Sequence, residues 1–121
     1  MKVIKMNQVS GDEVHSPLFT GGRVTRQALL SSEMASFFNV VMINFGTGAR
    51  NKFHTHTTDQ VLLVTEGTGI VATEDEERVV TVGEIIHIPA GEKHWHGATK
   101  DSAFSHINMI DADSKTEQME P

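Results

Sequence analysis

The chain has 121 residues, which is enough for one domain with a single hydrophobic core but not for two. Its 10 Lys and Arg residues against 16 Asp and Glu residues give a formal charge of −6, so we expect no nucleic-acid partner and no anionic membrane partner. Cysteine is absent, which excludes disulfides, thiolate metal ligands and a cysteine nucleophile, so any metal site must use nitrogen and oxygen donors.

Segments with strand character follow one another along the chain. The N-terminal residues contain no apolar run of the length that a signal peptide or a membrane span requires, so we expect a soluble, cytoplasmic protein. The β-branched and aromatic segment FFNVVMINFG predicts a strand over residues 37–45, and VLLVTEG repeats its pattern. IVATEDEERVVTV predicts a hairpin with an acidic tip at residues 74–77, and EIIHIP and FSHINMI predict two more strands.

The spacing of these segments indicates the fold class. Six or more short strands, with no helical period over a dozen residues, predict an all-β antiparallel sandwich or barrel. We expect residues 1–110 to form the domain, including an N-terminal strand segment. Residues 111–121 read as a polar C-terminal tail, either mobile or laid across a neighbouring subunit.

Two histidine pairs stand out because side chains alternate between the two faces of a strand. In HTHTTDQ, His54 and His56 share a face, and Gln60 keeps that face if the intervening TTD adds no bulge, which leaves Asp59 pointing away. In the second cluster, GEKHWHGA, the same alternation places His94 and His96 on one face and Trp95 on the opposite face.

A later histidine, His106 in SHINMI, shares the face of Asn108, so five of the seven histidines can converge on one interior, with His15 and His87 outside it. A single histidine is more often a surface or a core residue. Two His-x-His pairs between regularly spaced glycines favour a metal site instead.

The glycine spacing carries a family resemblance. Gly48, five residues, HTH, three residues, Gln60, six residues and Gly67 resemble the first cupin motif, which usually has Glu where this chain has Gln60. Gly83, five residues, PAG, two residues and His94 resemble the second motif, although Ala98 stands where that motif commonly has Asn. The resemblance covers residues 18–110 and implies a double-stranded β-helix, the jelly-roll barrel.

Within the cupin superfamily the resemblance narrows further. LFTG, GAR, HTH followed by Gln, GEKHWHGA and the histidine of SHI together resemble the small, single-domain bacterial manganese cupins with hydroxynitrile lyase activity, whose relatives are described as carboxymuconolactone decarboxylase-associated cupins. The resemblance implies a homo-oligomer, a dimer or tetramer, and one manganese ion per chain. It implies these metal ligands: His54, His56, Gln60 and His94. It also places His96 and His106 beside the metal as unbound polar groups.

The glutamine bears on the chemistry of the site. Three imidazoles and one amide oxygen are neutral donors that suit manganese, and equally iron, nickel, cobalt or zinc. A divalent ion in this set keeps its full charge, which favours polarising a hydroxyl or a carbonyl over activating oxygen. We therefore expect a metal-dependent lyase that cleaves a cyanohydrin or a related small hydroxyl compound to a carbonyl compound.

The expected proton acceptor is a histidine, with His106 preferred as the catalytic base and His96 as the second candidate. Either imidazole can instead orient a metal-ligating one. Apolar residues that fit a substrate pocket, or equally the core, are Val41, Ile43, Phe45 and Phe53. Two other functions stay open: another metal-dependent cupin enzyme, such as a dioxygenase or isomerase, and a non-catalytic ligand-binding cupin.

Overall fold

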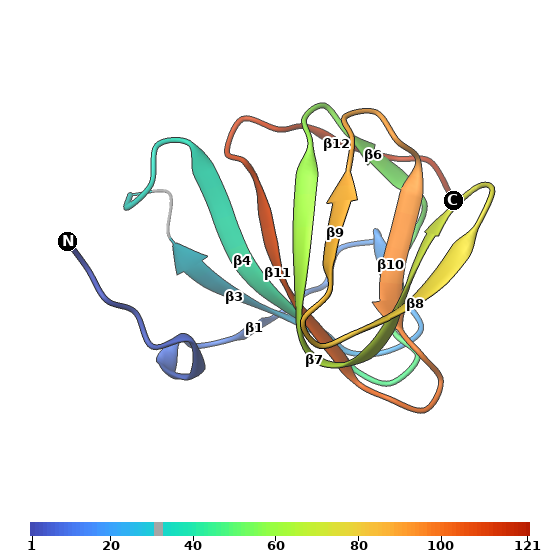
Figure 1. Cartoon of the computed structure of the whole chain (residues 1–121), viewed down its shortest axis with the longest axis horizontal. Helices are drawn as coiled ribbons and strands as arrows, with labels where there is room; N and C mark the ends of the chain where they lie inside the picture. Colours follow the sequence, from blue (N-terminus) through green and yellow to red (C-terminus); the bar gives the residue numbers. More distant parts are fainter. Residues whose placement is uncertain (31–32) are drawn as a thin grey trace.

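The computed structural model describes residues 1–30 and 33–121, and in this part of the chain it forms twelve β-strands and one short 3-10 helix, Met6–Gln8 (Figure 1). One sheet contains β1 (Asp12–Glu13), β3 (Val24–Leu30), β4 (Phe38–Phe45), β9 (Ile85–Ile88) and β11 (Phe104–Asp111). The other contains β2 (Phe19–Thr20), β5 (Arg50–Asn51), β6 (His54–His56), β8 (Glu77–Thr81), β10 (His94–Ala98) and β12 (Thr116–Gln118).

The long strand β7 (Gln60–Thr73) belongs to both sheets. Its first part pairs with β11 and β9, and its second part pairs with β10 and β8. The sheet order is β1-β3-β4-β11-β7-β10-β5-β2, so the sheet curls around a common interior, as Figure 1 shows. All of these pairings are antiparallel. The predicted all-β jelly-roll fold is therefore confirmed.

A glycine allows β7 to change sheets without ending. Gly67 has a φ of +73°, and a Cβ there would lie 1.9 Å from the backbone oxygen of Ala103. Both the left-handed conformation and the close approach require a residue without a side chain. Close to this point the pairing with β11 shifts register between Ser105 and His106, because β7 contains one extra residue, Thr65.

The hydrophobic core lies between the two sheets. Phe45 and Phe104 are almost completely buried, and their rings stack with centroids 5.9 Å apart. Val41 and Ile43 belong to the same buried cluster, together with Val64. Three of the four apolar pocket candidates are therefore core residues, and their contact with a substrate stays a prediction. This core supports the polar residues that line the adjoining interior.

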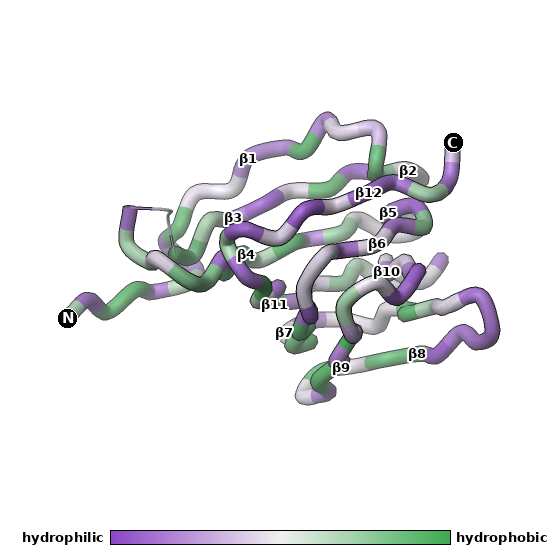
Figure 2. The backbone as a smooth tube through the Cα atoms, turned by 90° about the horizontal axis from the view of Figure 1, so that it is seen from above, coloured by the Kyte–Doolittle hydropathy of each residue, from purple (hydrophilic) through white to green (hydrophobic). Residues whose placement is uncertain are grey.

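The predicted elements match the observed ones closely. The strand expected over residues 37–45 is β4, and the expected hairpin is formed by β7 and β8, whose polar tip lies at residues 74–76 and is the purple loop beside β8 in Figure 2. Within the polar tail expected at residues 111–121, Thr116–Gln118 forms β12 and pairs with the chain's own β6. Among the described residues, no helix has the length and apolar character needed to cross a membrane.

Candidate metal centre

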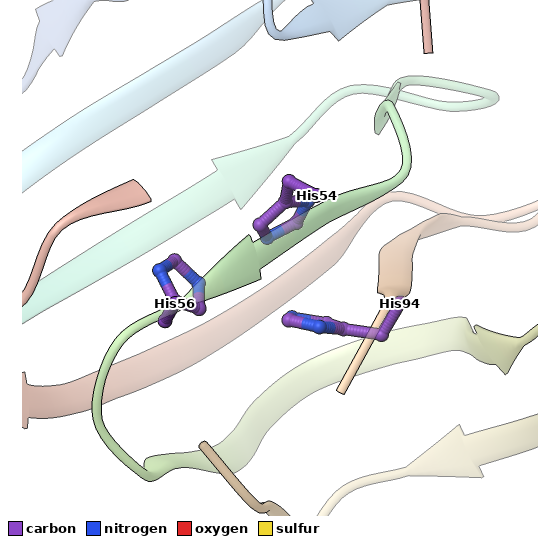
Figure 3. A group of neighbouring side chains, drawn as sticks. All are labelled: His54, His56 and His94. Carbon is purple, nitrogen blue, oxygen red and sulfur yellow. The ribbon is translucent and has the colours of Figure 1, made fainter. Parts of the chain in front are cut away.

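Three histidines from two strands meet at one point. β6 carries His54 and His56, and β10 begins at His94, which stands directly opposite His54 in the antiparallel register. One nitrogen atom from each ring lies within 4.8 Å of the other two. Figure 3 shows the three rings turning toward one another from their strands. The alternation of side chains along HTH therefore places both of its histidines at the same site.

The backbone orients two of these rings. His54 donates from Nδ1 to the carbonyl oxygen of Lys52 at 2.6 Å, and His94 donates from Nδ1 to that of Glu92 at 2.8 Å. A carbonyl oxygen only accepts, so each imidazole keeps its proton on Nδ1 and presents an unprotonated Nε2. This is the tautomer that a metal ion requires when Nε2 is the ligand atom.

The third ring is oriented by a side chain. Nδ1 of His56 lies 2.9 Å from the hydroxyl of Thr116 on β12. Nε2 of His56 is buried and has no hydrogen-bond partner among the described residues. A buried polar atom without a partner is costly, and a metal ion at the centre of the three rings would satisfy it.

The amide of Gln60 lies beside this triad. Gln60 is the first residue of β7 and is buried, and its Nε2 donates to Oδ1 of Asn108. Because the nitrogen is held there, the carbonyl oxygen faces the site, 3.1 Å from Nε2 of His94. The structure thus brings together all four residues that the resemblance implies as ligands.

The four side chains fit one divalent transition metal, because they supply three imidazole nitrogens and one amide oxygen around an unpartnered buried nitrogen. Burial, with a smaller effect of the neighbouring His94, lowers the pKa of His54 to about 3. The same two causes lower the pKa of His56 to about 4, and burial lowers the pKa of His94. All three rings are therefore neutral near pH 7, as metal ligation requires.

The carboxylate next to Gln60 in the sequence faces away from the site. Asp59 accepts a hydrogen bond at 2.9 Å from Nε2 of His87 and another at 2.9 Å from the backbone N–H of Ala90. The hydrogen bond from His87, followed by that from Ala90, lowers the pKa of the Asp59 carboxyl. The expected outward orientation of Asp59 is confirmed, and Gln60 is the residue after the HTH pair that turns inward.

The two remaining interior histidines form a buried pair next to the triad. The His96 ring lies 5.7 Å from the rings of both His54 and His94, measured between centroids. Nε2 of His106 lies 2.9 Å from Nδ1 of His96, so the two rings share one hydrogen bond. Burial lowers the pKa of His106 to about 3 and, with a further effect of His106, holds the pKa of His96 well below its usual range.

An asparagine that the sequence did not single out holds this pair. Oδ1 of Asn51 accepts from the backbone N–H of His96 at 2.8 Å, and its Nδ2 lies 3.2 Å from Nε2 of the same ring. Nδ1 of His106 has no hydrogen-bond partner in the part of the chain that the structure describes. Trp95 points to the opposite face, as predicted, where the guanidinium of Arg50 lies 4.3 Å over its ring.

Comparison with known families agrees with this geometry. The cupin domain model matches residues 41–110, which is more than half of the chain. The chain belongs to the cupin family. The matched region contains both histidine clusters and Gln60. A crystal structure of a cupin-like protein from Thermotoga maritima is 31% identical, with a TM-score of 0.84, covering 91% of this chain and 85% of that chain.

Two curated relatives are similar to part of the chain. An (R)-mandelonitrile lyase from Granulicella tundricola is 40% identical over 68 residues, which cover 54% of this chain and 50% of that protein. An acireductone dioxygenase from Parasynechococcus marenigrum is 43% identical over 68 residues, which cover 50% of this cupin and 37% of that protein. The chain thus spans half or less of the length of these two relatives.

Proposed function

We propose that this cupin is a metal-dependent lyase that cleaves a cyanohydrin, or a related small hydroxyl compound, to an aldehyde and a stabilised leaving group. The observation that carries the proposal is the neutral donor set of His54, His56, His94 and the Gln60 amide. The similarity to an (R)-mandelonitrile lyase over half of the chain supports the same reaction class. The proposed cofactor is one divalent ion per chain, with manganese preferred.

The donor set determines which chemistry the site favours. No side chain among the four carries a negative charge, so they leave the full charge of a divalent ion in place. When bound, such an ion supplies Lewis acidity that polarises a hydroxyl or carbonyl oxygen. A carboxylate at Gln60 would reduce that charge. The amide therefore favours heterolytic cleavage over the activation of oxygen.

The His96–His106 pair is the proposed acceptor of the substrate proton. Burial keeps both rings neutral, so each imidazole can take up one further proton. The hydroxyl proton passes to this pair, the carbonyl C=O forms, and the bond to the nitrile carbon breaks with its electron pair leaving as cyanide. Return of the proton to cyanide gives hydrogen cyanide and restores the neutral pair.

A second candidate is a metal-dependent dioxygenase, which the similarity to an acireductone dioxygenase supports. Oxygen uptake with an enediol or diketone substrate distinguishes this reaction, because cyanohydrin cleavage consumes no oxygen. An isomerase would convert its substrate without either oxygen uptake or cyanide release. A homo-oligomeric assembly and a cytoplasmic location stay predictions from the sequence.

The test combines metal analysis with a cleavage assay. Protein grown with manganese, iron, nickel or zinc in turn should carry roughly one metal ion per chain with at least one of them. The loaded protein should release benzaldehyde from mandelonitrile, and a chelator should abolish that release. Occupancy below about a tenth with every metal would contradict the metal site. Full occupancy without cleavage, but with oxygen uptake on a diketone, would favour the second candidate.

A further inference from the structure

The C-terminal residues 115–120, here called the C-terminal strap, lie along the strand that carries two of the metal ligands. β12 pairs antiparallel with β6, and the register sets Thr116 opposite His56 and Gln118 opposite His54. Figure 1 shows β12 beside β6 at one end of the curled sheet. Residues directly opposite in an antiparallel pair face the same side, so Thr116 belongs to the face that carries the ligands.

The strap is fastened at both ends of β6. The N–H of Thr57 donates to the carbonyl oxygen of Lys115 at 3.0 Å, and the N–H of Lys115 donates back to the hydroxyl of Thr57 at 2.9 Å. At the other end, the N–H of Met119 donates to the carbonyl oxygen of Phe53 at 2.7 Å. Hydrogen bonds to the strap therefore begin just before the HTH segment and end just after it.

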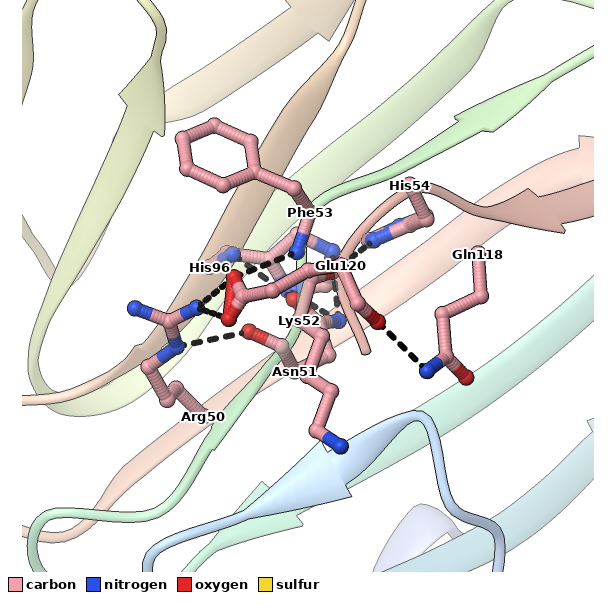
Figure 4. A network of polar contacts seen from close by, with 8 residues as sticks. All are labelled: Arg50, Asn51, Lys52, Phe53, His54, His96, Gln118 and Glu120. Atoms are coloured by element: carbon pink, nitrogen blue, oxygen red, sulfur yellow. Dashed lines mark hydrogen bonds and ion pairs between the residues drawn. The ribbon is translucent and has the colours of Figure 1, made fainter.

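A charged pair holds the end of the strap. Nη2 of Arg50 donates to both carboxylate oxygens of Glu120, at 2.6 and 2.8 Å, and the N–H of Phe53 reaches the same carboxylate at 3.3 Å (Figure 4). The side chains of Arg50 and Glu120 are only 27% and 33% exposed. Arg50 also lies over the ring of Trp95, the residue between His94 and His96. The strap is thus linked to both histidine-bearing strands.

The orientation of His56 depends on the strap in a way that the other two ligands do not share. His54 and His94 donate to backbone oxygens two residues before each of them, so their partners move with their own strands. The partner of His56 is the hydroxyl of Thr116, which is 60 residues away in the sequence. Without the Thr116 hydroxyl, Nδ1 of His56 has no hydrogen-bond partner among the described residues to orient its ring.

We propose that the strap completes the metal centre, with Thr116 as the positioning residue that orients the ring of His56 for metal binding. The inference rests on the ligand set proposed above but not on the reaction. Hydrogen-bond partners of metal-ligating imidazoles are worth about 10- to 100-fold in metal affinity. Binding is reciprocal, so a bound metal must in turn stabilise the docked strap.

The test is a titration of the full chain with Mn²⁺ alone. The electron paramagnetic resonance signal of the free ion measures how much Mn²⁺ remains unbound. Thr116→Val keeps the shape and the strand preference of the residue but removes the acceptor, and it should weaken Mn²⁺ binding about 10- to 100-fold. Thr116→Ser restores a hydroxyl and should recover most of the affinity. Glu117→Ala is the matched control. Glu117 stands opposite Thr55, on the other face of the strand pair from the ligands, so this variant should bind Mn²⁺ as the unmodified protein does.

Two further measurements test the inference if the Thr116→Val variant folds poorly. Glu120→Gln removes the charge that Arg50 holds, and it should lower Mn²⁺ affinity in the same direction by a smaller factor. In the unmodified protein, the amides of Thr57 and Met119 should exchange with deuterium more slowly when Zn²⁺ is bound. Equal Mn²⁺ affinity in Thr116→Val, Glu120→Gln and the unmodified protein would overturn the inference. If the unmodified protein binds no metal at all, the proposed ligand set itself would be wrong.

Discussion

Gln60 stands where the first cupin motif usually has glutamate, and its surroundings favour an amide. The side-chain nitrogen of Gln60 donates to Oδ1 of Asn108, while its oxygen faces Nε2 of His94. A carboxylate cannot donate a hydrogen bond, so glutamate would leave Asn108 to turn its own amide around. One residue therefore sets both the charge of the site and the hydrogen bond to β11.

Gln60→Glu tests the role of that neutral donor. The variant should keep its metal, because an anionic oxygen replaces a neutral one at nearly constant volume. Its turnover of mandelonitrile should fall about 10- to 100-fold, or about 1.4 to 3 kcal/mol of transition-state stabilisation, because the added charge weakens the Lewis acid. Elemental analysis and benzaldehyde release measure the two effects separately. Full metal content with undiminished cleavage would show that the neutral ligand does not control the chemistry.

His106→Asn separates proton transfer from Lewis acidity. His106 contacts the other interior histidine, His96, through Nε2 and is absent from the ligand triad, so the variant should retain its metal while turnover falls. Asp59→Ala is the control for both variants. Asp59 bonds to His87 on the outer face, so its loss should change neither metal content nor turnover. Loss of metal from the Asp59 variant would contradict the inward orientation of Gln60.

At the scale of elements, β10 and β5 approach each other closely at a glycine. Gly97 stands opposite Arg50, and a Cβ at Gly97 would lie 2.4 Å from Cβ of Arg50 and 2.5 Å from the backbone oxygen of Ala49. The close approach brings Arg50 to both Trp95 and Glu120. The glycine therefore supports the packing that holds the strap.

Gly97→Ala should lower the free energy of unfolding by about 1 to 3 kcal/mol, because the added methyl group forces two backbones apart. Urea denaturation of the metal-free protein measures this change. Gly11→Ala is the control, since the nearest atom to its Cβ would be Cγ of Gln27 at 3.5 Å, an ordinary contact. That variant should change stability by less than about 0.5 kcal/mol. Equal effects of the two substitutions would contradict the tight contact at Gly97.

The sequence predicts the strands that carry the ligands well, because the residues that define them are neighbours in the sequence. Alternation over three residues places His54 with His56 on one face, and Gly48 marks the turn before them. The sequence does not reveal that β7 is one continuous strand. VLLVTEG and IVAT read as parts of separate strands, whereas one 14-residue strand passes through Gly67, whose conformation bends it without ending it.

The tail could not be predicted in the same way, because its contacts are distant in sequence. TEQ has no apolar alternation, and its burial pattern is exposed throughout, so nothing local indicates a strand. The tail pairs with the edge of β6, and the contact between Arg50 and Glu120, which are 70 residues apart in the sequence, holds it there. The role of Asn51, which holds His96 across 45 residues, is equally invisible before the strands are placed.

At the scale of the whole molecule, five imidazoles share one small interior. The ring centroids of His96 and His106 lie 4.7 Å apart, and those of His54 and His94 lie 4.3 Å apart. Burial and mutual repulsion both disfavour the charged forms, so the folded chain takes up few protons there. The unfolded chain has no such restriction. Folding is therefore linked to proton release below the usual pKa of histidine.

The sign of the resulting pH dependence follows from the lowered values. Burial moves the pKa of His54 and of His106 from 6.5 to about 3. Above pH 6.5 both rings are neutral in the folded and unfolded states, and they contribute no pH dependence. Below it the unfolded state binds protons that the folded state cannot, so each such ring removes about 1.4 kcal/mol of stability per pH unit. Carboxylates stay ionised down to about pH 5 and add little in this window.

The metal-free protein should accordingly unfold at a lower urea concentration at about pH 5 than at about pH 7. His106→Asn removes one buried imidazole and should make the loss between these two pH values smaller, whatever its effect on stability at neutral pH. His15→Asn, a change at an exposed position, should leave the loss unchanged. Urea midpoints that do not move between the two pH values would mean that the interior histidines accept protons without unfolding, and that the barrel does not hold them neutral for a metal.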